Sequence, residues 1–440
     1  MLELLIFLNL GVACLALIRA RPAAVILGLS QVVVLRGLSS VRDFGQTAAF
    51  LPGAIFSDGN IETATFIFAG STVAFAVAAL VGPRSKSSQQ VPGMSLPRVP
   101  AVVLALIGIY FLAYSFAAGT ILEHSYGTED LNRSALNIGG ARVLMYAILI
   151  YEAYRRVLMQ EMSPVTGIVG IFFLCAIAEL IRGSTGIPIG ILFTSSVMLF
   201  LGIGTSSGLS VLARGFPLVM TSLLATALVV VVVRIARQDV STEGINVVFE
   251  ALEKVGAQES ERAKTGRGLE KFANGIQGAE HVLECITLHD SGYSRSWRSA
   301  YAPIEYTFKP AFLLKPLGLE RSKEAPWELG DYYIHGGGIN VIGEFYWNGG
   351  YLCVITLSAL LAWFAFLCDT RYRGSAAWLM MLCNFGPGLL MGYEYGWAQI
   401  CRGAINGCIV IGAYVVWRKF FGRRSGALTP MVSPERPLVD

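Results

Sequence analysis

The sequence predicts an all-α integral membrane protein with about 11 transmembrane helices (roughly 10–13) and one large extracytoplasmic loop. Three observations support this prediction. Hydrophobic residues make up 54% of the 440 residues and charged residues only 15%, whereas a soluble domain carries about 25% charged residues. Apolar segments long enough to cross a bilayer recur along the chain. A single long hydrophilic stretch, residues 235–349, interrupts them.

Each of these segments is mostly apolar over a length near the 20 residues or so that a span requires. They cover residues 2–18, 23–41, 61–82, 99–118, 141–158, 165–181, 187–204, 216–233, 350–368, 376–393 and 398–417. The second is the weakest, because Arg36 interrupts it. The N-terminus lacks the basic region that begins a cleaved signal peptide, so we expect it to remain as the first helix.

The distribution of basic residues predicts the orientation, because Lys and Arg favour cytoplasmic connections. Connections after odd-numbered spans, with the C-terminal tail, hold 14 of these residues, and the short even-numbered connections hold 6. We therefore expect a multi-pass membrane protein with a cytoplasmic C-terminus and with the long loop in the periplasm or at the cell exterior. The expected units are an N-terminal transmembrane bundle (1–234), a periplasmic loop with short helices (235–349), C-terminal transmembrane helices (350–417) and a cytoplasmic tail (418–440).

The long loop has the composition of a functional segment rather than a disordered one, since it is rich in Trp and Tyr. Val282, Cys285 and Ile286 recur near helical spacing and predict a helix there. Aromatic rings pack on sugar faces, and Arg and Lys bind phosphate. The loop therefore fits a site for a phosphorylated carbohydrate, although aromatic residues also line membrane interfaces. The net charge of +4 includes no concentrated basic face, which argues against nucleic acid.

Three residues are candidates for catalysis. Arg182 ends the sixth span next to Gly183, which leaves backbone room for a ligand; the alternative is a side chain that reaches the interface. Glu344 lies just outside or within the start of the ninth span, where a carboxylate is costly unless it is used or paired with a buried arginine. His335 precedes three glycines whose N–H groups can cradle an anion or a sugar, and it can act as a base near neutral pH.

Further cations in or near the loop are candidates for binding. Arg295 and Arg298 are three residues apart and would share a helical face, or else form a solvated basic surface. Arg142 begins the fifth span. His281 and His289 lack a third ligand at a suitable spacing, so no metal site is expected, and the sequence has no phosphate-binding loop or dinucleotide fingerprint.

The order of elements and one motif resemble a known family. Many spans precede Arg182, and a late outside loop contains Tyr293 and the run PIEYTFKP (303–310). The loop ends in INVIGEFYWNGG, whose Gly-Glu-x-Tyr-x-Asn-x-Gly run covers residues 343–350. This combination resembles the Wzy-type bacterial polysaccharide (O-antigen or exopolysaccharide) repeat-unit polymerases.

The resemblance implies a fold like the GT-C-type membrane glycosyltransferases. Such enzymes polymerise oligosaccharide repeat units carried on undecaprenyl pyrophosphate at the periplasmic face, moving the growing glycan to the non-reducing end of an incoming unit. No cofactor is needed, and a flippase and a chain-length regulator are expected partners. By analogy, Arg182 and either Arg295 or Arg298 would bind the pyrophosphate, and His335 or Glu344 would assist the attacking hydroxyl. The other expected substrate-binding residues are Arg142, Lys309, Tyr293, Tyr346 and Asn348.

Two other functions fit parts of the sequence. An O-antigen ligase-like glycosyltransferase would share the fold and the outside loop but use a different acceptor. A transporter of lipid-linked oligosaccharides would also span the membrane many times. Transporters often contain inverted repeats and interrupted helices with ion sites at mid-membrane, whereas this sequence has no internal repeat and few charges at the centres of its spans.

Overall fold

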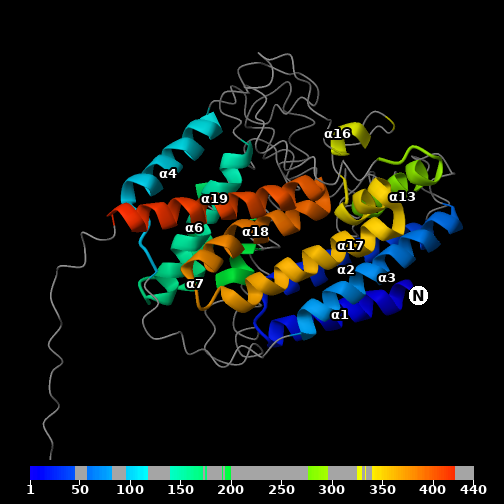
Figure 1. The fold of residues 1–440 in the computed structure, drawn as a ribbon, viewed down its shortest axis with the longest axis horizontal. Coiled ribbons are helices and arrows are strands. Elements are labelled where there is room, and N and C mark those ends of the chain that lie inside the picture. The colour runs from blue at the N-terminus through cyan, green and yellow to red at the C-terminus, as the bar shows by residue number, and fades with distance from the viewer. Residues whose placement is uncertain are drawn as a thin grey trace, which may run out of the picture.

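The computed structural model describes the helical parts of the chain. The described residues are 1–44, 57–81, 96–116, 139–171, 174–175, 191, 194–199, 276–295, 325–329, 332 and 339–421. In these ranges every element with defined bounds is an α-helix (Figure 1). The all-α prediction is therefore confirmed for the described part of the chain.

The helices of the described residues have the following bounds. They are α1 (Leu2–Ile18), α2 (Pro22–Phe44), α3 (Asp58–Leu80), α4 (Ala101–Phe116), α6 (Gly139–Leu158), α7 (Pro164–Ile171), α13 (Ile276–Asp290), α16 (Ala325–Leu329), α17 (Val341–Arg371), α18 (Ala376–Tyr395) and α19 (Trp397–Phe421).

Four of the helices are long and apolar enough to cross a membrane. Their apolar stretches are Pro22–Arg42, Asp58–Val77, Val341–Arg371 and Trp397–Val416. Shorter apolar helices cover Leu2–Ile18 and Ala101–Ala113. These helices have the character of a membrane protein. The expected total of about 11 spans stays a prediction, and the eighth expected span, 216–233, lies outside the described residues.

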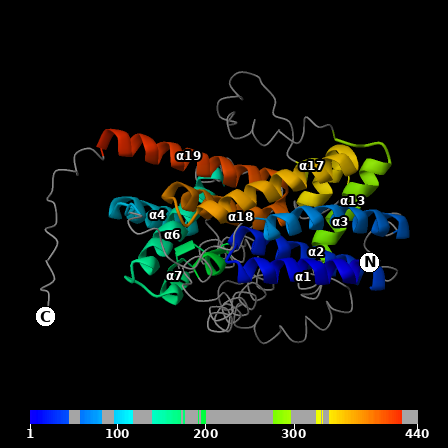
Figure 2. The same ribbon diagram turned by 60° about the horizontal axis from the view of Figure 1, so that its bottom comes forward.

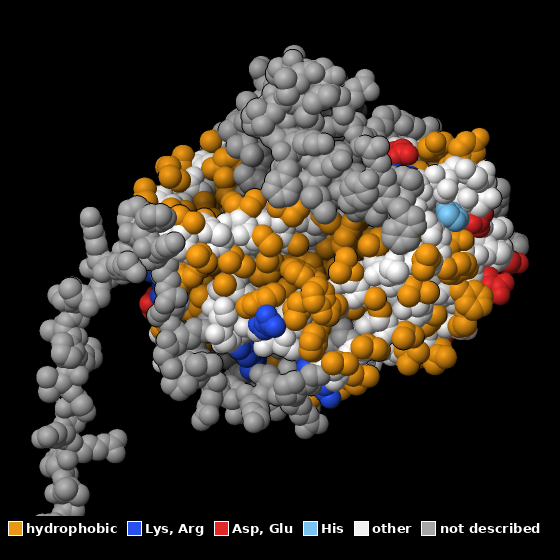
Figure 3. All heavy atoms as spheres, viewed as in Figure 1, with side chains coloured by type: hydrophobic (Ala, Val, Ile, Leu, Met, Phe, Trp, Pro, Cys, Tyr) orange, Lys and Arg blue, Asp and Glu red, His pale blue; other side chains and the backbone are white. Residues whose placement is uncertain are grey.

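The outward faces of these helices are apolar. In α17, Leu352, Ile355 and Trp363 are more than half exposed, and hydrophobic side chains are spread widely over the described surface in view, where charged ones are few (Figure 3). A soluble monomer rarely exposes so large a contiguous apolar surface. We conclude that these faces are suited to contact with lipid.

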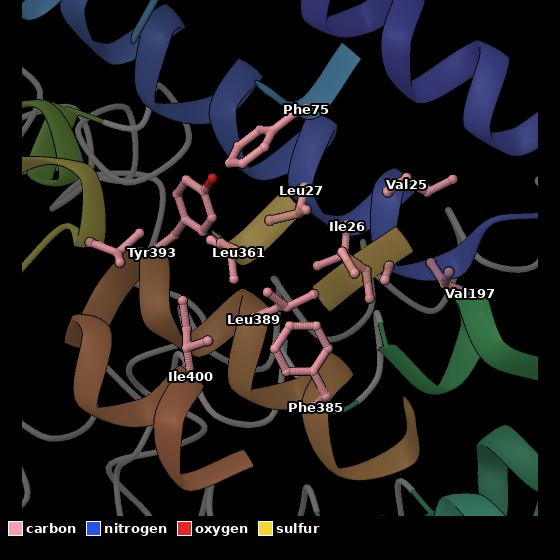
Figure 4. Close-up of a cluster of buried hydrophobic side chains, with 14 of the residues drawn as sticks. Val25, Ile26, Leu27, Phe75, Val197, Leu361, Phe385, Leu389, Tyr393 and Ile400 are labelled. Atoms are coloured by element: carbon pink, nitrogen blue, oxygen red, sulfur yellow. The ribbon is translucent and has the colours of Figure 1, made fainter. Parts of the chain in front are cut away.

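The centre of the bundle packs α2 against α17 and α18. Ile26 and Leu27 of α2 lie near Leu361 of α17 and Phe385 and Leu389 of α18 (Figure 4), and all five are almost fully buried. The apolar stretch of α2 is 67% buried, more than that of the other three candidate spans. The second expected span, the weakest in sequence, is thus a central helix, and Arg36 lies on its exposed side.

Basic connections share one end of the bundle. Arg19 and Arg21 follow α1 and donate hydrogen bonds to the carbonyls of Leu80 and Val81 at the end of α3, over 2.5 and 2.6 Å. The Tyr372 hydroxyl, just after α17, donates to the Ala20 carbonyl over 3.2 Å. The connections that follow α1, α3 and α17 therefore lie together.

The helix predicted around Val282, Cys285 and Ile286 is α13, and all three side chains are fully buried. Its outer end is tied to α3 by a hydrogen bond from Asn60 Nδ2 to Thr287 Oγ1, 2.9 Å long. The N-terminus of α1 lies at this same end of the bundle (Figure 2). The described helix of the long loop is therefore opposite the basic connections.

The inner end of α13 reaches down beside α2. A Cβ added to Gly278 would lie 3.3 Å from Val34 Cγ2, and Val34 is roughly 18 Å along α2 from Pro22. Ala279 and Leu283 of α13 are buried within the main core. This helix is thus wedged into the bundle, whereas the sequence predicts it as part of a loop outside.

The ninth expected span begins earlier than its predicted start at residue 350. Helix α17 starts at Val341, where the side chain of Asn340 accepts hydrogen bonds from the Ile342 and Gly343 amides over 2.9 and 3.4 Å. The helix is kinked at Gly349 and Gly350, and Gly350 has φ +61°, a conformation that favours glycine. The Gly-Glu-x-Tyr-x-Asn-x-Gly run therefore forms a separate buried helical segment before the lipid-facing one.

Candidate functional site

Glu344 is the centre of the candidate site. It lies in the first turn of α17 and is only 3% exposed. Its Oε2 accepts a hydrogen bond of 2.7 Å from the Trp397 amide, the first residue of α19, and its Oε1 lies 3.6 Å from Arg295 Nη1. A helix N-terminus favours a negative charge. The carboxylate is thus bound by one helix end and lies beside one guanidinium.

The turn between α18 and α19 makes room for this carboxylate. Gly396 has φ +82°, and a Cβ added there would collide with Glu344 Oε2 and with Ile339. Only glycine therefore combines the backbone conformation with the close approach of the carboxylate.

Arg295 is fixed from several directions. Its Nε lies 2.7 Å from Glu328 Oε2 of α16, and its side chain is 4% exposed. The guanidinium carbon lies 5.4 Å from the centroid of the Trp347 ring, a cation–π distance. Since Glu328 and Glu344 flank it, the guanidinium is held in one place between two carboxylates.

The kink in α17 provides the backbone anchor of Arg295. In an unbroken helix the Trp347 carbonyl would face the Tyr351 amide one turn further on. At the kink this carbonyl accepts a hydrogen bond of 2.9 Å from the Arg295 amide. The Trp347 indole also donates to the Tyr293 carbonyl over 2.6 Å. Trp347 thus joins the end of the long loop to the kinked helix.

Asn348 follows Glu344 by one helical turn, so the two side chains share a face of α17. It is 1% exposed, and within the described part of the chain neither its Oδ1 nor its Nδ2 has a hydrogen-bond partner. Glu344, Arg295, Asn348, Trp347 and Glu328 are called the Glu344 site from here on.

Aromatic side chains border the Glu344 site. The Tyr346 hydroxyl donates to Asp290 Oδ1 over 3.0 Å, and its ring centroid lies 4.6 Å from that of His289. The Tyr293 ring is 60% exposed and lies 5.8 Å from the Tyr332 ring. Tyr346 is thus tied to the end of α13, while Tyr293 is largely exposed, and an exposed aromatic ring can stack on a sugar.

The structure brings together half of the residues predicted for the site. Glu344, Arg295, Asn348, Tyr293 and Tyr346 all lie at the junction of α13, α17 and α19. The remaining predictions lie outside the described residues. These are His335, Arg182, Arg298, Lys309 and the side chain of Arg142, which falls in the first turn of α6.

The sequence analysis did not identify several residues that contact Arg295 and Glu344. Trp347 and Glu328 contact Arg295, and the amide of Trp397 binds Glu344. A helical reading of the motif would have placed Trp347 within one turn of Glu344. Nothing in the sequence pairs Trp397 with Glu344, because that contact depends on how α17 and α19 pack.

The chemistry available in the site is polar and ionic. Burial raises the pKa of the Cys285 thiol, and the nearby Glu284 and Glu344 carboxylates raise it further, so this cysteine stays a neutral thiol rather than a nucleophile. Among the described residues no group of three His, Cys, Asp or Glu could hold a metal ion. What the site offers is a carboxylate, a guanidinium, an amide and aromatic rings, a set suited to hydroxyl-rich ligands.

Comparisons of the chain with protein-family models, with curated proteins and with solved structures found no match. A function must therefore be inferred from the geometry of the Glu344 site and from its place in the bundle.

Proposed function

We propose that the protein is a lipid-pyrophosphate-dependent glycosyltransferase, a polysaccharide polymerase. It would join undecaprenyl-pyrophosphate-linked repeat units at the periplasmic face of the bacterial inner membrane. The observation that best supports this proposal is the buried ion pair of Glu344 and Arg295, whose charged atoms lie 3.6 Å apart. The pair lies at one end of an apolar helical bundle, opposite the end that holds the basic connections. An ionic site at such a boundary suits a substrate with a lipid tail and a polar sugar head.

The proposed reaction displaces a pyrophosphate. A hydroxyl oxygen at the non-reducing end of the incoming unit attacks the anomeric carbon of the growing glycan. The new C–O bond forms as the bond to the lipid pyrophosphate breaks, and the leaving group takes the electron pair as undecaprenyl pyrophosphate. The proton of the hydroxyl passes to a base. The principal demand is stabilisation of charge on the leaving group.

The described residues supply parts of this machinery. Arg295 is a planar guanidinium in a fixed position, the type of donor that binds phosphate oxygens. Because Glu328 and Glu344 already neutralise it, Arg182, Arg298 and Lys309 are the proposed additional cations. Glu344 or His335 is the proposed base for the hydroxyl proton. The exposed Tyr293 ring is the proposed platform for a sugar face.

One observation favours a different function. The kink at Gly349 and Gly350 interrupts α17 directly after Glu344 and Asn348, and transporters place substrate sites at interrupted helices. Transport of the same lipid-linked oligosaccharide is therefore the second candidate. A ligase-like enzyme would use the same chemistry with another acceptor.

The test is polymerisation in proteoliposomes. Purified protein is given a lipid-linked repeat unit, and the products are separated on a gel. The unaltered protein should yield a ladder of products. Glu344→Gln and Arg295→Lys should each reduce the rate of polymerisation at least tenfold, which corresponds to a loss of roughly 1.4 kcal/mol of transition-state stabilisation. Glu161→Gln is the matched control, since Glu161 also pairs with an arginine, Arg155, at 3.0 Å but is 48% exposed.

The same assay separates the alternatives. Movement of the lipid-linked unit across the bilayer without a ladder would replace the polymerase by a transporter. A single transfer to an unrelated acceptor, again without a ladder, would indicate a ligase. Full activity in both site variants would remove the Glu344 site from the mechanism.

A further inference from the structure

The side-chain amide of Asn348 is buried but makes no hydrogen bond with the described residues. It is 1% exposed, and both atoms of its amide lack hydrogen-bond partners among the described residues. A buried polar group that makes no hydrogen bond is destabilising, and most buried polar groups in native proteins are satisfied. Leucine has a similar size and would not carry this penalty. Within the described residues, no hydrogen bond of the Asn348 side chain therefore explains its presence.

Asn348 lies close in the chain to residues that are exposed. Gly349, the next residue, is partly exposed, and Tyr351 beyond the kink is 46% exposed. Glu344 lies one turn earlier on the same face. Along α17, Asn348 thus lies between the buried carboxylate of Glu344 and partly exposed residues at the kink.

The chemistry of the amide defines what it would recognise. Its Oδ1 accepts hydrogen bonds and its Nδ2 donates them, and both are unused. The complementary group offers a donor and an acceptor side by side. On a sugar ring this is a pair of adjacent hydroxyls or an acetamido group. A phosphate would leave Oδ1 unsatisfied, because an ionised phosphate oxygen only accepts.

We propose that Asn348 is a specificity-determining residue that binds an adjacent donor and acceptor on the sugar of the substrate. This inference rests on the proposed function and assigns the neutral part of the substrate to Asn348, leaving the charged part to the cations. Binding satisfies the amide, so a substitution removes substrate affinity without removing stability.

The test compares Asn348→Leu with a matched substitution elsewhere. Asn384 in α18 is also buried, at 2% exposed, with an unpartnered Oδ1, but its Nδ2 donates to the Met380 carbonyl over 2.8 Å. For Asn348→Leu we expect a Tm equal to or above that of the unaltered protein and a KM for the lipid-linked unit raised about tenfold or more, with kcat nearly unchanged. Asn384→Leu should leave KM unchanged.

Binding is also measured without turnover, as the rise in Tm that the lipid-linked unit causes. Asn348→Leu should shrink this rise, and Asn348→Ser, whose hydroxyl can both donate and accept a hydrogen bond, should restore part of it. The measurement is repeated with lipid-linked units that contain an acetamido sugar and with units that contain only hydroxyl groups. The type of unit whose affinity falls more in Asn348→Leu identifies the group that Asn348 binds.

The outcomes are distinct. A lower Tm in both Asn348→Leu and Asn348→Ser, with an unchanged ligand-induced shift, would make Asn348 a structural residue and overturn the inference. An unchanged KM and an unchanged shift would also overturn it. No ladder from the unaltered protein, together with a ligand-induced shift that depends on Asn348, would refute the polymerase but keep the sugar contact.

Discussion

Glu344 and Arg295 form an ion pair in which both side chains are almost fully buried, at 3% and 4% exposed. Burial of a charge is costly unless the charge is paired and hydrogen-bonded. Here the amide of Trp397 binds one carboxylate oxygen, and Glu328 lies against the guanidinium. The pair is thus held by residues from two other parts of the chain, α16 and α19.

Arg295→Leu should destabilise the protein, because it leaves the Glu344 carboxylate buried without its cation. A broken buried pair typically costs about 3–5 kcal/mol. The free energy of unfolding in detergent is the measurement. Arg42→Leu is the matched control, since Arg42 pairs with Glu3 at 2.6 Å with both side chains exposed and should change stability by less than about 1 kcal/mol. Equal effects of the two substitutions would contradict the buried pairing.

Gly396→Ala should disrupt the site through its backbone. The left-handed conformation of Gly396 and the collision of an added Cβ with Glu344 Oε2 both oppose the substitution. We expect a loss of about 2 kcal/mol or more of stability, together with a loss of activity. The control is Gly412→Ala, within α19, where no atom lies within 4 Å of the added Cβ; it should stabilise by up to about 1 kcal/mol. A stable, active Gly396→Ala protein would show that Glu344 need not approach this turn.

At the scale of elements, α17 has a carboxylate near each end that binds the N-terminus of another helix. Glu344 accepts the Trp397 amide of α19. Asp369 accepts the Ala23 and Ala24 amides of α2 over 2.8 and 2.9 Å. The first amides of a helix have no partner within it, so each carboxylate satisfies donors that would otherwise be unpaired at the membrane boundary.

Asp369→Ala tests whether Asp369, which binds the N-terminus of α2, contributes to stability alone, in contrast to Glu344, which is also proposed to act in the reaction. Loss of a helix cap costs about 1–2 kcal/mol, so thermal unfolding should begin at a lower temperature. KM and kcat should stay near those of the unaltered protein, because Asp369 lies at the opposite end of α17 from Glu344, beyond the kink. A KM shift like that of a Glu344 site variant would mean that the two ends of α17 are coupled.

The elements that were predictable are those whose signal is local. Hydropathy gives the helical segments, and helical spacing gives α13. The first turns of α17 were assigned to the loop, because Glu344 and Asn348 make that segment polar in sequence. They are helical because Asn340 caps them and because Arg295, from a distant segment, pairs with Glu344. The ion pair was foreseen as an alternative, but its partner is set by tertiary packing.

At the scale of the whole molecule, the two ends of the bundle differ in chemistry. Arg19, Arg21 and Tyr372 mark one end, and the Glu344 site lies at the other. Helix α17 connects them, and the part after its kink, Tyr351 to Arg371, would alone extend about 30 Å, close to the hydrocarbon thickness of a bilayer, ~30 Å. The proposed periplasmic reaction requires that the basic end be cytoplasmic.

Cysteine labelling tests this orientation. Ser291 follows α13, Gly374 follows α17, and both are exposed. A membrane-impermeant maleimide applied to spheroplasts should label Ser291→Cys, whereas Gly374→Cys should react only after permeabilisation. The unaltered protein gives the background of its native cysteines. Labelling of Gly374→Cys alone in intact spheroplasts would place the Glu344 site in the cytoplasm and exclude the periplasmic polymerase. Labelling of both before permeabilisation would show that α17 does not separate the two sides of the membrane.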